Sequence, residues 1–278
     1  MTLIGKIQDD HGIVGRDEEL AMSLTVLEAG RHLLLQGPVG VGKTTVALAV
    51  CRHLGRATIR VDGDDRYTES KLTGWFDPPL VLQKGYSEET FFAGPLVEAM
   101  RGGAVLFINE LNRMPEAVQN VLLPALDERL LIVPRIGVVR AVEGFQVVAT
   151  QNPVEYIATG HLSEALRDRF EHVGLDYQSE EEERAIVTRE TGCDDDELVG
   201  AAVAVTRATR DDPRFRKGAS VRAAIAMVAM VSAARSDAPD ALQRAAAAAL
   251  PTRVELHDEQ EGTLDEVLTE IVLAARKK

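Results

Sequence analysis

The sequence feature that most constrains the fold of this chain is a glycine-rich stretch between an apolar run and a helix-forming segment. It reads Gly37-Pro38-Val39-Gly40-Val41-Gly42-Lys43-Thr44. This spacing fits G-x-x-x-x-G-K-[ST], in which glycines let backbone N–H groups converge on phosphate oxygens. The helix that follows would direct its positive end at the same anion. We therefore expect a phosphate-binding loop between a strand and a helix.

The residue types in this loop predict ATP and Mg²⁺ as the cofactors. Lys43 is expected to reach the β- and γ-phosphates, and the Thr44 hydroxyl is expected to hold Mg²⁺. Thr45 completes the predicted nucleotide-binding segment, which covers residues 37–45.

Continuous apolar runs alternate with helix-like segments through the first 177 residues. Runs of this kind are typical of strands covered on both faces of a parallel sheet. The expected strands cover residues 33–36, 57–61, 104–108, 145–150 and 172–175, and the expected helices include 44–54 and 116–128. This order predicts an α/β domain at 1–177 with a parallel five-stranded sheet, doubly wound.

The pattern changes after residue 177. Ser179 followed by Glu182 is a capping-box start, and we expect no strand beyond it. Helices are predicted over residues 180–191, 197–209, 220–234, 239–250 and 263–276. Residues 178–278 should therefore form a small all-helical domain.

The ends of two predicted strands carry polar residues suited to hydrolysis. The run at 104–108 leads into Asn109 and Glu110, and a carboxylate there would lie in the crevice where α/β folds bind ligands. Glu110 is placed to orient or deprotonate an attacking water. Asn109 stands where such sites usually carry a Mg²⁺-linked Asp, and its amide brings no charge. Asn152 follows the next strand and could help hold the water.

Composition excludes several classes of function. The net charge of −13 argues against general attraction to nucleic acid, which requires basic surface. Two cysteines make neither a disulfide framework nor a metal site. The first ten residues carry acids where a signal peptide is basic and then apolar. The longest apolar segments, 223–234 and 245–250, are too short to span a bilayer. We expect a cytoplasmic protein without membrane insertion.

With these pieces in order, the chain resembles the MoxR family of AAA+ ATPases. It is similar, more distantly, to the magnesium-chelatase I subunit and the Rubisco-activase-like CbbQ group. The resemblance rests on the phosphate loop and on Ile13-Val14-Gly15-Arg16, Asn109-Glu110-Leu111-Asn112-Arg113, Ala149-Thr150-Gln151-Asn152-Pro153, Leu166-Arg167-Asp168-Arg169-Phe170 and Gly218-Ala219-Ser220-Val221-Arg222.

The resemblance implies roles for residues outside the loop. Val14 and Gly15 would lie against the adenine, and Asn152 would be the sensor-1 residue. Arg169 would be the arginine finger that reaches a neighbouring subunit's γ-phosphate, and Arg222 would be the sensor-2 arginine of a helical lid. Arg167 competes with Arg169 for the finger role, and Arg113 is a second candidate for an interface. For each arginine the alternative is a surface salt bridge of small value.

The resemblance also implies a homo-oligomer, a hexameric ring, that acts on a separate protein partner. That partner would carry a von Willebrand factor A domain, for which this chain has no room. Two inserts are expected as hairpins, about residues 75–92 and 130–144. The first holds five of the chain's 12 aromatic residues, which either contact a substrate or pack their own hairpin.

Two hypotheses of function follow. The first is an ATP-hydrolysing, chaperone-like ring that remodels or activates a partner. The second is a nucleotide-gated adaptor that hydrolyses little, because Asn109 replaces the usual Asp. A GTPase is disfavoured because the sequence has no Asn-Lys-x-Asp guanine signature. A small-molecule kinase is disfavoured because it would not need Arg169 at an interface.

Overall fold

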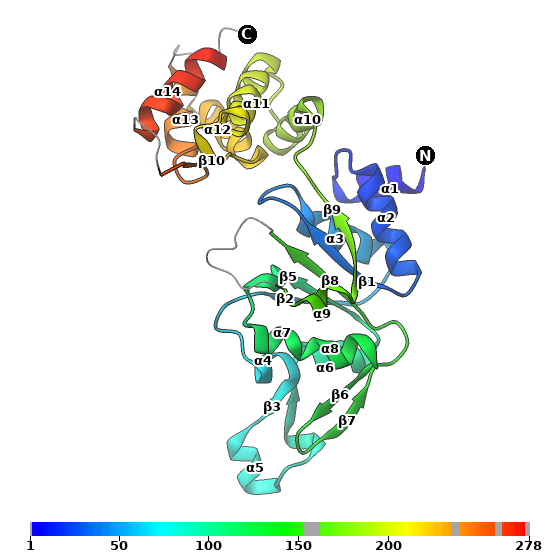
Figure 1. Ribbon diagram of the computed structural model, residues 1–278. Helices are drawn as coiled ribbons and strands as arrows, with labels where there is room; N and C mark the ends of the chain where they lie inside the picture. Colours follow the sequence, from blue (N-terminus) through cyan, green and yellow to red (C-terminus); the bar gives the residue numbers. More distant parts are fainter. Residues whose placement is uncertain (1, 153–161, 235–239, 259–262, 276–278) are drawn as a thin grey trace. The chain divides into compact units, whose positions relative to one another are not determined.

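The computed structural model describes residues 2–152, 162–234, 240–258 and 263–275 (Figure 1). Two compact units make up the chain. One contains Met1–Pro38 and Gly42–Asp176, and the other contains Val39–Val41 and Tyr177–Lys278. Among the described residues, no helix has the length and apolar character needed to cross a membrane.

The first unit is built on the predicted five-stranded parallel sheet, which is confirmed. Its strands are β1 (His32–Gln36), β2 (Thr58–Asp62), β5 (Val105–Asn109), β8 (Gln146–Gln151) and β9 (Phe170–Gly174). They lie in the order β2-β5-β8-β1-β9, and all four neighbouring pairs are parallel. Parallel strands end at one edge, so the segments that follow β1, β5 and β8 meet there.

Helices cover both faces of this sheet. They are α1 (Leu3–His11), α2 (Asp17–Glu28), α3 (Lys43–His53), α4 (Glu69–Thr73), α6 (Pro95–Gly102), α7 (Glu116–Asn120), α8 (Leu122–Asp127) and α9 (Glu164–Arg167). Ile108 and Val147 belong to a core cluster that also includes residues of α6 and α8. Their neighbours Phe107 and Val148 are equally buried. Because successive strand residues point to opposite faces, this burial explains the continuous apolar runs in the sequence.

The single helix expected over residues 116–128 is wrong. The structure has two helices there, α7 and α8, with Val121 between them. Pro124 supplies the reason, because proline lacks an N–H group and its ring clashes with the carbonyl four residues earlier. That carbonyl belongs to Asn120, the last residue of α7.

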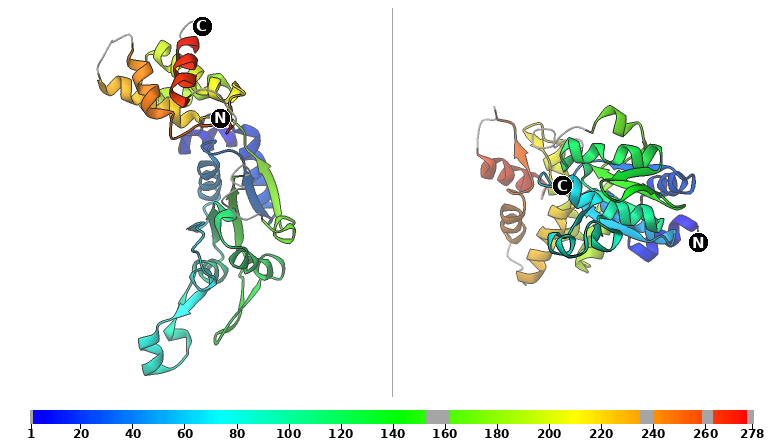
Figure 2. Two further views of the ribbon diagram at one scale, coloured as in Figure 1. Left: turned by 60° about the vertical axis from the view of Figure 1, so that its left-hand side comes forward. Right: turned by 90° about the horizontal axis from the view of Figure 1, so that it is seen from below.

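Two antiparallel hairpins extend from the same end of the first unit (Figures 1 and 2). The first pairs β3 (Gly74–Phe76) with β4 (Phe91–Ala93), and α5 (Pro78–Lys84) and the 3₁₀ helix Glu88–Thr90 lie between them. The second pairs β6 (Leu130–Val133) with β7 (Gly137–Arg140). The Arg135 guanidinium lies 5.3 Å from the Tyr86 ring centre, so the two hairpins touch.

The second unit is mainly helical. It contains α10 (Glu180–Thr191), α11 (Asp196–Asp211), α12 (Val221–Ala234), α13 (Ala241–Ala249) and α14 (Leu264–Ala275). These helices share one aliphatic core. The capping box of Ser179 and Glu182 begins α10.

The expectation that no strand follows residue 179 is wrong. A short antiparallel pair joins β10 (Phe215–Lys217) to β11 (Glu255–Leu256). Strands of three and two residues are too short to show the alternation that sequence analysis relies on. The Phe215 side chain is buried in the core that the helices of the second unit share, and this contact holds the strand pair against those helices.

Candidate functional site

The glycine-rich loop connects β1 to α3 in a conformation that requires glycine. Gly40 and Gly42 have φ values of +83° and +92°, in the left-handed region where a side chain is strained. Gly42 is the N-cap residue of α3, which begins at Lys43. Val41 is buried, and Thr45 is exposed in the first turn of α3. The loop therefore ends at the positive pole of a helix.

The Lys43 ammonium is folded onto its own loop. Its Nζ donates to the carbonyl oxygens of Gly37 and Pro38, each at 2.7 Å. The ammonium thus has two oxygen acceptors within the loop. The loop, its lysine and the helix end therefore fit a nucleotide triphosphate.

Hydroxyl and amide groups from three elements converge beside this loop. The Thr44 hydroxyl donates to Asn109 Oδ1 at 2.9 Å, and the Thr150 hydroxyl donates to the same oxygen at 3.0 Å. Thr150 Oγ1 also accepts from the Glu110 N–H group at 2.8 Å. The start of α3 and the ends of β5 and β8 are thus linked through one amide oxygen. A threonine hydroxyl held in this way fits Mg²⁺, which prefers oxygen ligands.

A carboxylate that sequence analysis missed completes this cluster. Asn109 Nδ2 donates to Asp62 Oδ1 at 3.0 Å. Asp62 is the last residue of β2 and pairs in register with Asn109. The Arg60 guanidinium, and to a lesser extent the Asn109 amide, hold the pKa of Asp62 below its usual value, so this side chain is ionised at neutral pH.

Glu110 adopts a strained backbone conformation at the end of β5. Its φ and ψ are +57° and +53°, which non-glycine residues rarely adopt, and such strain is concentrated at functional sites. Its carboxylate accepts from Arg113 Nη1 at 2.9 Å, within the 3₁₀ helix Leu111–Arg113. Arg113 is therefore engaged with Glu110 in this structure.

Asn152 follows β8 and is buried. The Asn112 side chain donates to its carbonyl oxygen at 3.5 Å. Pro153, the last residue of the motif that begins at Ala149, lies outside the described residues. The structure thus links Thr44, Asn109 and Glu110 through hydrogen bonds. Lys43 lies next to Thr44 in the loop, and Asn152 follows β8, the strand beside β5.

The two finger candidates differ in their surroundings. Arg169 donates from Nε and Nη2 to the carboxylate of Asp127, with distances of 2.8 to 2.9 Å, and from Nη1 to the Ala165 carbonyl at 3.0 Å. Arg167 is exposed at the end of α9, and no ion pair with another described residue is found for it. Arg169 is therefore the positioned member of the pair.

The remaining predicted residues lie on other elements. Val14 and Gly15 form the loop between α1 and α2, where Gln8 Nε2 donates to the Gly15 carbonyl at 2.7 Å. The buried Arg16 side chain pairs with Glu19 at 2.6 Å and also donates to the Asp176 carbonyl. Arg222 is exposed in the first turn of α12, in the second unit.

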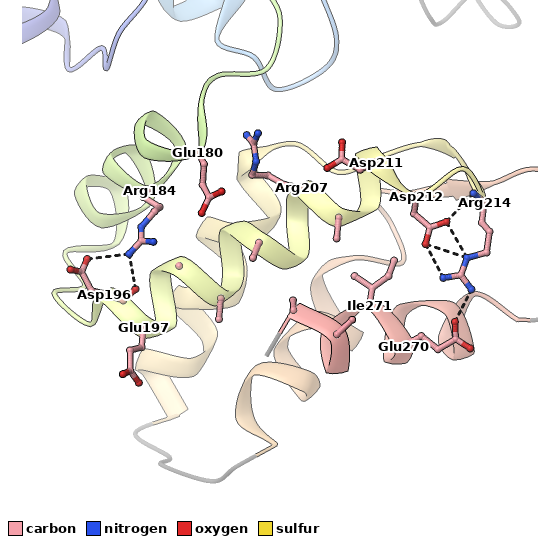
Figure 3. A pocket seen from close by; sticks show the side chains of 16 residues that line it. Glu180, Arg184, Asp196, Glu197, Arg207, Asp211, Asp212, Arg214, Glu270 and Ile271 are labelled. Atoms are coloured by element: carbon pink, nitrogen blue, oxygen red, sulfur yellow. Dashed lines mark hydrogen bonds and ion pairs between the residues drawn. The ribbon is translucent and has the colours of Figure 1, made fainter. Parts of the chain in front are cut away.

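A wide hollow of about 1140 Å³ lies within the second unit between α10, α11 and α14 (Figure 3). Small residues of α11, including Gly200 and Ala204, are among those that line it. Arg214 at its rim bridges Asp212 and Glu270. The residues that line the hollow do not include the glycine-rich loop, and no cluster of metal-binding side chains is found among the described residues.

The fold and the loop define a P-loop nucleotide-binding protein with a helical second unit. The sequence model of the AAA domain (dynein-related subfamily) matches residues 32–170, which is half of the chain. The chain belongs to this AAA family, whose members bind ATP, typically with Mg²⁺, and commonly assemble into rings.

Relatives of this chain include several ATPases. The gas vesicle ATPase GvpN2 of Halobacterium salinarum is 33% identical over 231 residues, covering 77% of this chain and 66% of the relative. NorQ of Paracoccus denitrificans is 34% identical over 170 residues, covering 60% of this chain and 61% of the relative. The chain thus spans less than two thirds of the length of either protein.

Solved structures share the fold at low sequence identity. A candidate ATPase from Cytophaga hutchinsonii has a TM-score of 0.53 at 23% identity, covering 98% of this chain and 93% of that one. RuvB of Thermotoga maritima, a Holliday junction branch migration motor, has a TM-score of 0.53 at 21% identity, covering 84% and 70%. These likenesses support the AAA+ fold.

Proposed function

We propose that this chain binds ATP with Mg²⁺ in the loop at residues 37–45 and hydrolyses the ATP as a MoxR-type AAA+ ring ATPase. The observation that carries this proposal is the cluster at the strand ends. There the Thr44 hydroxyl, the Asn109 amide and the backbone of Glu110 are joined through Thr150 beside the loop.

The loop residues would bind and position the triphosphate. Lys43 would exchange its two carbonyl acceptors for β- and γ-phosphate oxygens, and the loop N–H groups would surround the same oxygens. Thr44 would hold Mg²⁺ directly and Asn109 would do so indirectly, and this ion would neutralise phosphate charge in the transition state. Val14 and Gly15 would contact the adenine.

Hydrolysis would depend on residues at the strand ends and on a second subunit. Glu110 would act as the general base toward a water that Asn152 helps to hold. Arg169 of one subunit would reach the γ-phosphate bound by its neighbour, which would make turnover depend on ring assembly. Arg222 would sense the nucleotide from the second unit.

The work done by this cycle is proposed to be chaperone-like remodelling or activation of a separate protein. That partner would carry a von Willebrand factor A domain, and the ring would be a cytoplasmic hexamer. Two exposed hairpins, at residues 75–92 and 130–144, support a protein client. The net charge of −13 supports a client other than nucleic acid.

Phosphate release from the purified protein tests the enzymatic part of this proposal. With ATP and Mg²⁺ we expect turnover that falls by about 10²–10⁴ in Glu110→Gln, because the amide cannot accept the water's proton. Retention of ATP by this variant should be undiminished. Competition of labelled ATP by GTP distinguishes adenine from guanine specificity.

The alternative function is a nucleotide-gated adaptor with little hydrolysis, which Asn109 favours because it removes the usual negative charge. Wild-type turnover no higher than that of Glu110→Gln, together with tight ATP binding, would support the adaptor and contradict the ATPase. Client capture is a separate measurement. Glu110→Gln held in ATP should retain the partner in a pull-down, and the nucleotide-free protein should release it.

A further inference from the structure

The neutral Asn109 at the end of β5 is accompanied by a carboxylate one strand away. Asp62 ends β2 in register with Asn109 and accepts from its Nδ2 at 3.0 Å. Gly63, which follows Asp62, brings the ends of β2 and β5 together. The Gly63 N–H group donates to the Asn109 carbonyl at 2.7 Å, and a Cβ at Gly63 would lie 2.1 Å from the Glu110 carbonyl oxygen.

The carboxylate of Asp62 determines which way the Asn109 amide faces. An ionised carboxylate can only accept hydrogen bonds, whereas an amide donates from one end and accepts at the other. The NH₂ end of Asn109 must therefore face Asp62, and its oxygen must face Thr44 and Thr150. Without Asp62 the amide could reverse, because the threonine hydroxyls can donate or accept.

The direction of the amide controls what Thr44 can offer a cation. A hydroxyl has one proton and two acceptor lone pairs. When Thr44 gives its proton to Asn109 Oδ1, as it does at 2.9 Å, both lone pairs remain for a metal ion. A reversed amide would donate to Thr44 and occupy one of those lone pairs. A carboxylate at position 109 would need no such control, because both of its oxygens accept.

We infer that Asp62 is a positioning residue for the Mg²⁺ of the nucleotide site, acting through Asn109 on the Thr44 hydroxyl. This inference rests on the proposed function, because it assumes that Mg²⁺ and ATP bind at Thr44. Asp62 also pairs with Arg60 at 2.7 Å, but both side chains are about half exposed, with exposed fractions of 59% and 47%. An exposed pair of this kind contributes little to stability.

The test compares the loss of Asp62 in two backgrounds. The apparent Mg²⁺ affinity is read from the rise in thermal unfolding midpoint during a Mg²⁺ titration at saturating ATP, with Glu110→Gln present throughout to stop turnover. With Asn109 in place, Asp62→Val should weaken this affinity about 10-fold, the low end of the effect of removing an outer partner of a metal ligand, because Asp62 acts on Thr44 through Asn109. In a protein that also carries Asn109→Asp, Asp62→Val should change the apparent Mg²⁺ affinity by no more than about threefold.

Three controls accompany the test. Asp65→Asn removes the same charge from an exposed position close by and should leave the Mg²⁺ affinity unchanged. Unfolding without nucleotide shows whether each variant folds, and Asp62→Ala replaces Asp62→Val if the latter does not. Asp62→Asn keeps a neutral acceptor and should recover part of the affinity.

The possible results separate this inference from the proposed function. The positioning role of Asp62 would be overturned if Asp62→Val lowered the Mg²⁺ affinity equally with Asn109 and with Asn109→Asp. It would also be overturned if Asp62→Val lowered nothing with Asn109 in place. A parent protein that shows no Mg²⁺-dependent stabilisation by ATP would overturn the proposed function itself. Loss confined to the Asn109 background would support the inference, and no purely structural role of Asp62 predicts that result.

Discussion

His32 is a buried titratable residue at the start of β1. Its ring packs edge-on between Phe145 and Phe170, with ring centres 6.3 and 6.2 Å away, and its Nδ1 accepts from the Val147 N–H group at 2.9 Å. Burial is the main reason that its pKa falls from 6.5 to about 4, because the charged form loses its hydration. The neutral ring thus connects β1 to β8 inside the first unit.

This shift predicts how stability depends on pH. The unfolded chain takes up a proton at His32 near pH 6.5, whereas the folded chain does so near pH 4. The contribution of the neutral His32 ring to the free energy of unfolding is fully present above about pH 6.5, and it is lost as the pH falls toward about 4. The loss amounts to about 3 kcal/mol as an order of magnitude.

Unfolding by urea at a series of pH values measures this loss. His32→Gln keeps an acceptor for the Val147 N–H group but does not titrate, so its stability should fall less steeply between pH 6.5 and 4. Parallel stability curves for the two proteins would show that His32 is not the titrating group.

At the scale of elements, the two hairpins carry exposed apolar side chains. Trp75 and Phe92 are directly paired across β3 and β4, with ring centres 5.9 Å apart and planes 14° from parallel. They are 50% and 45% exposed, and Ile132 on β6 is 71% exposed. Phe76 and Phe91 point the other way and pack on each other with ring centres 5.1 Å apart. Phe76 and Phe91 therefore pack the hairpin, as one of the two readings predicts. Contact with a substrate stays a prediction for the exposed Trp75 and Phe92.

The outward pair predicts a separable effect on client binding. Trp75→Ser with Phe92→Ser should leave ATP retention unchanged and should abolish partner capture by Glu110→Gln in ATP, because apolar contact area is lost. The matched control is Met22→Ser, which alters another exposed apolar side chain, on α2, at 53% exposure. Undiminished capture by the double variant would assign client binding to another surface.

The elements that could be predicted from sequence are those with local signals. The loop motif, the apolar runs and the capping box at Ser179 each lie within a short window, and the structure has strands and helices at those places. Asp62 could not be found in this way, because its partner is 47 residues away and the register of β2 against β5 brings the two together. The break between α7 and α8 did have a local signal in the sequence, Pro124, which the prediction of a single helix did not use.

At the scale of the whole molecule, the proposal requires neighbouring subunits to complete each other's sites. Arg169 is held by Asp127 of its own chain with both carboxylate oxygens engaged. This pair fixes the direction in which the guanidinium points. To reach a neighbour's γ-phosphate, the Arg169 guanidinium would have to leave Asp127 or donate to the carboxylate and the phosphate at the same time.

A mixing experiment tests this dependence between subunits. Lys43→Ala should bind no nucleotide but keep its arginine finger, and Arg169→Ala should bind nucleotide but lack the finger. Each alone should lose about 10³-fold or more in turnover, and an equal mixture should recover activity above either one, because some pockets then combine an intact loop with an intact finger.

The competing finger residue serves as the control. Arg167→Ala should retain turnover within about tenfold and should not be needed for complementation. If Arg167→Ala behaves as described for Arg169→Ala, and Arg169→Ala does not, the finger role passes to Arg167. If no mixture exceeds its components, hydrolysis does not use an arginine supplied by a neighbour.

The contacts of Lys43 with its own loop have a consequence for the proposed binding of ATP. Because the carbonyl oxygens of Gly37 and Pro38 accept from the ammonium, Lys43 has hydrogen-bond acceptors within the same loop that is proposed to bind the phosphates. Binding of a triphosphate would exchange these carbonyl oxygens for phosphate oxygens. The contribution of Lys43 to ATP affinity would therefore be the difference between two sets of hydrogen bonds, and not the full strength of its bonds to phosphate.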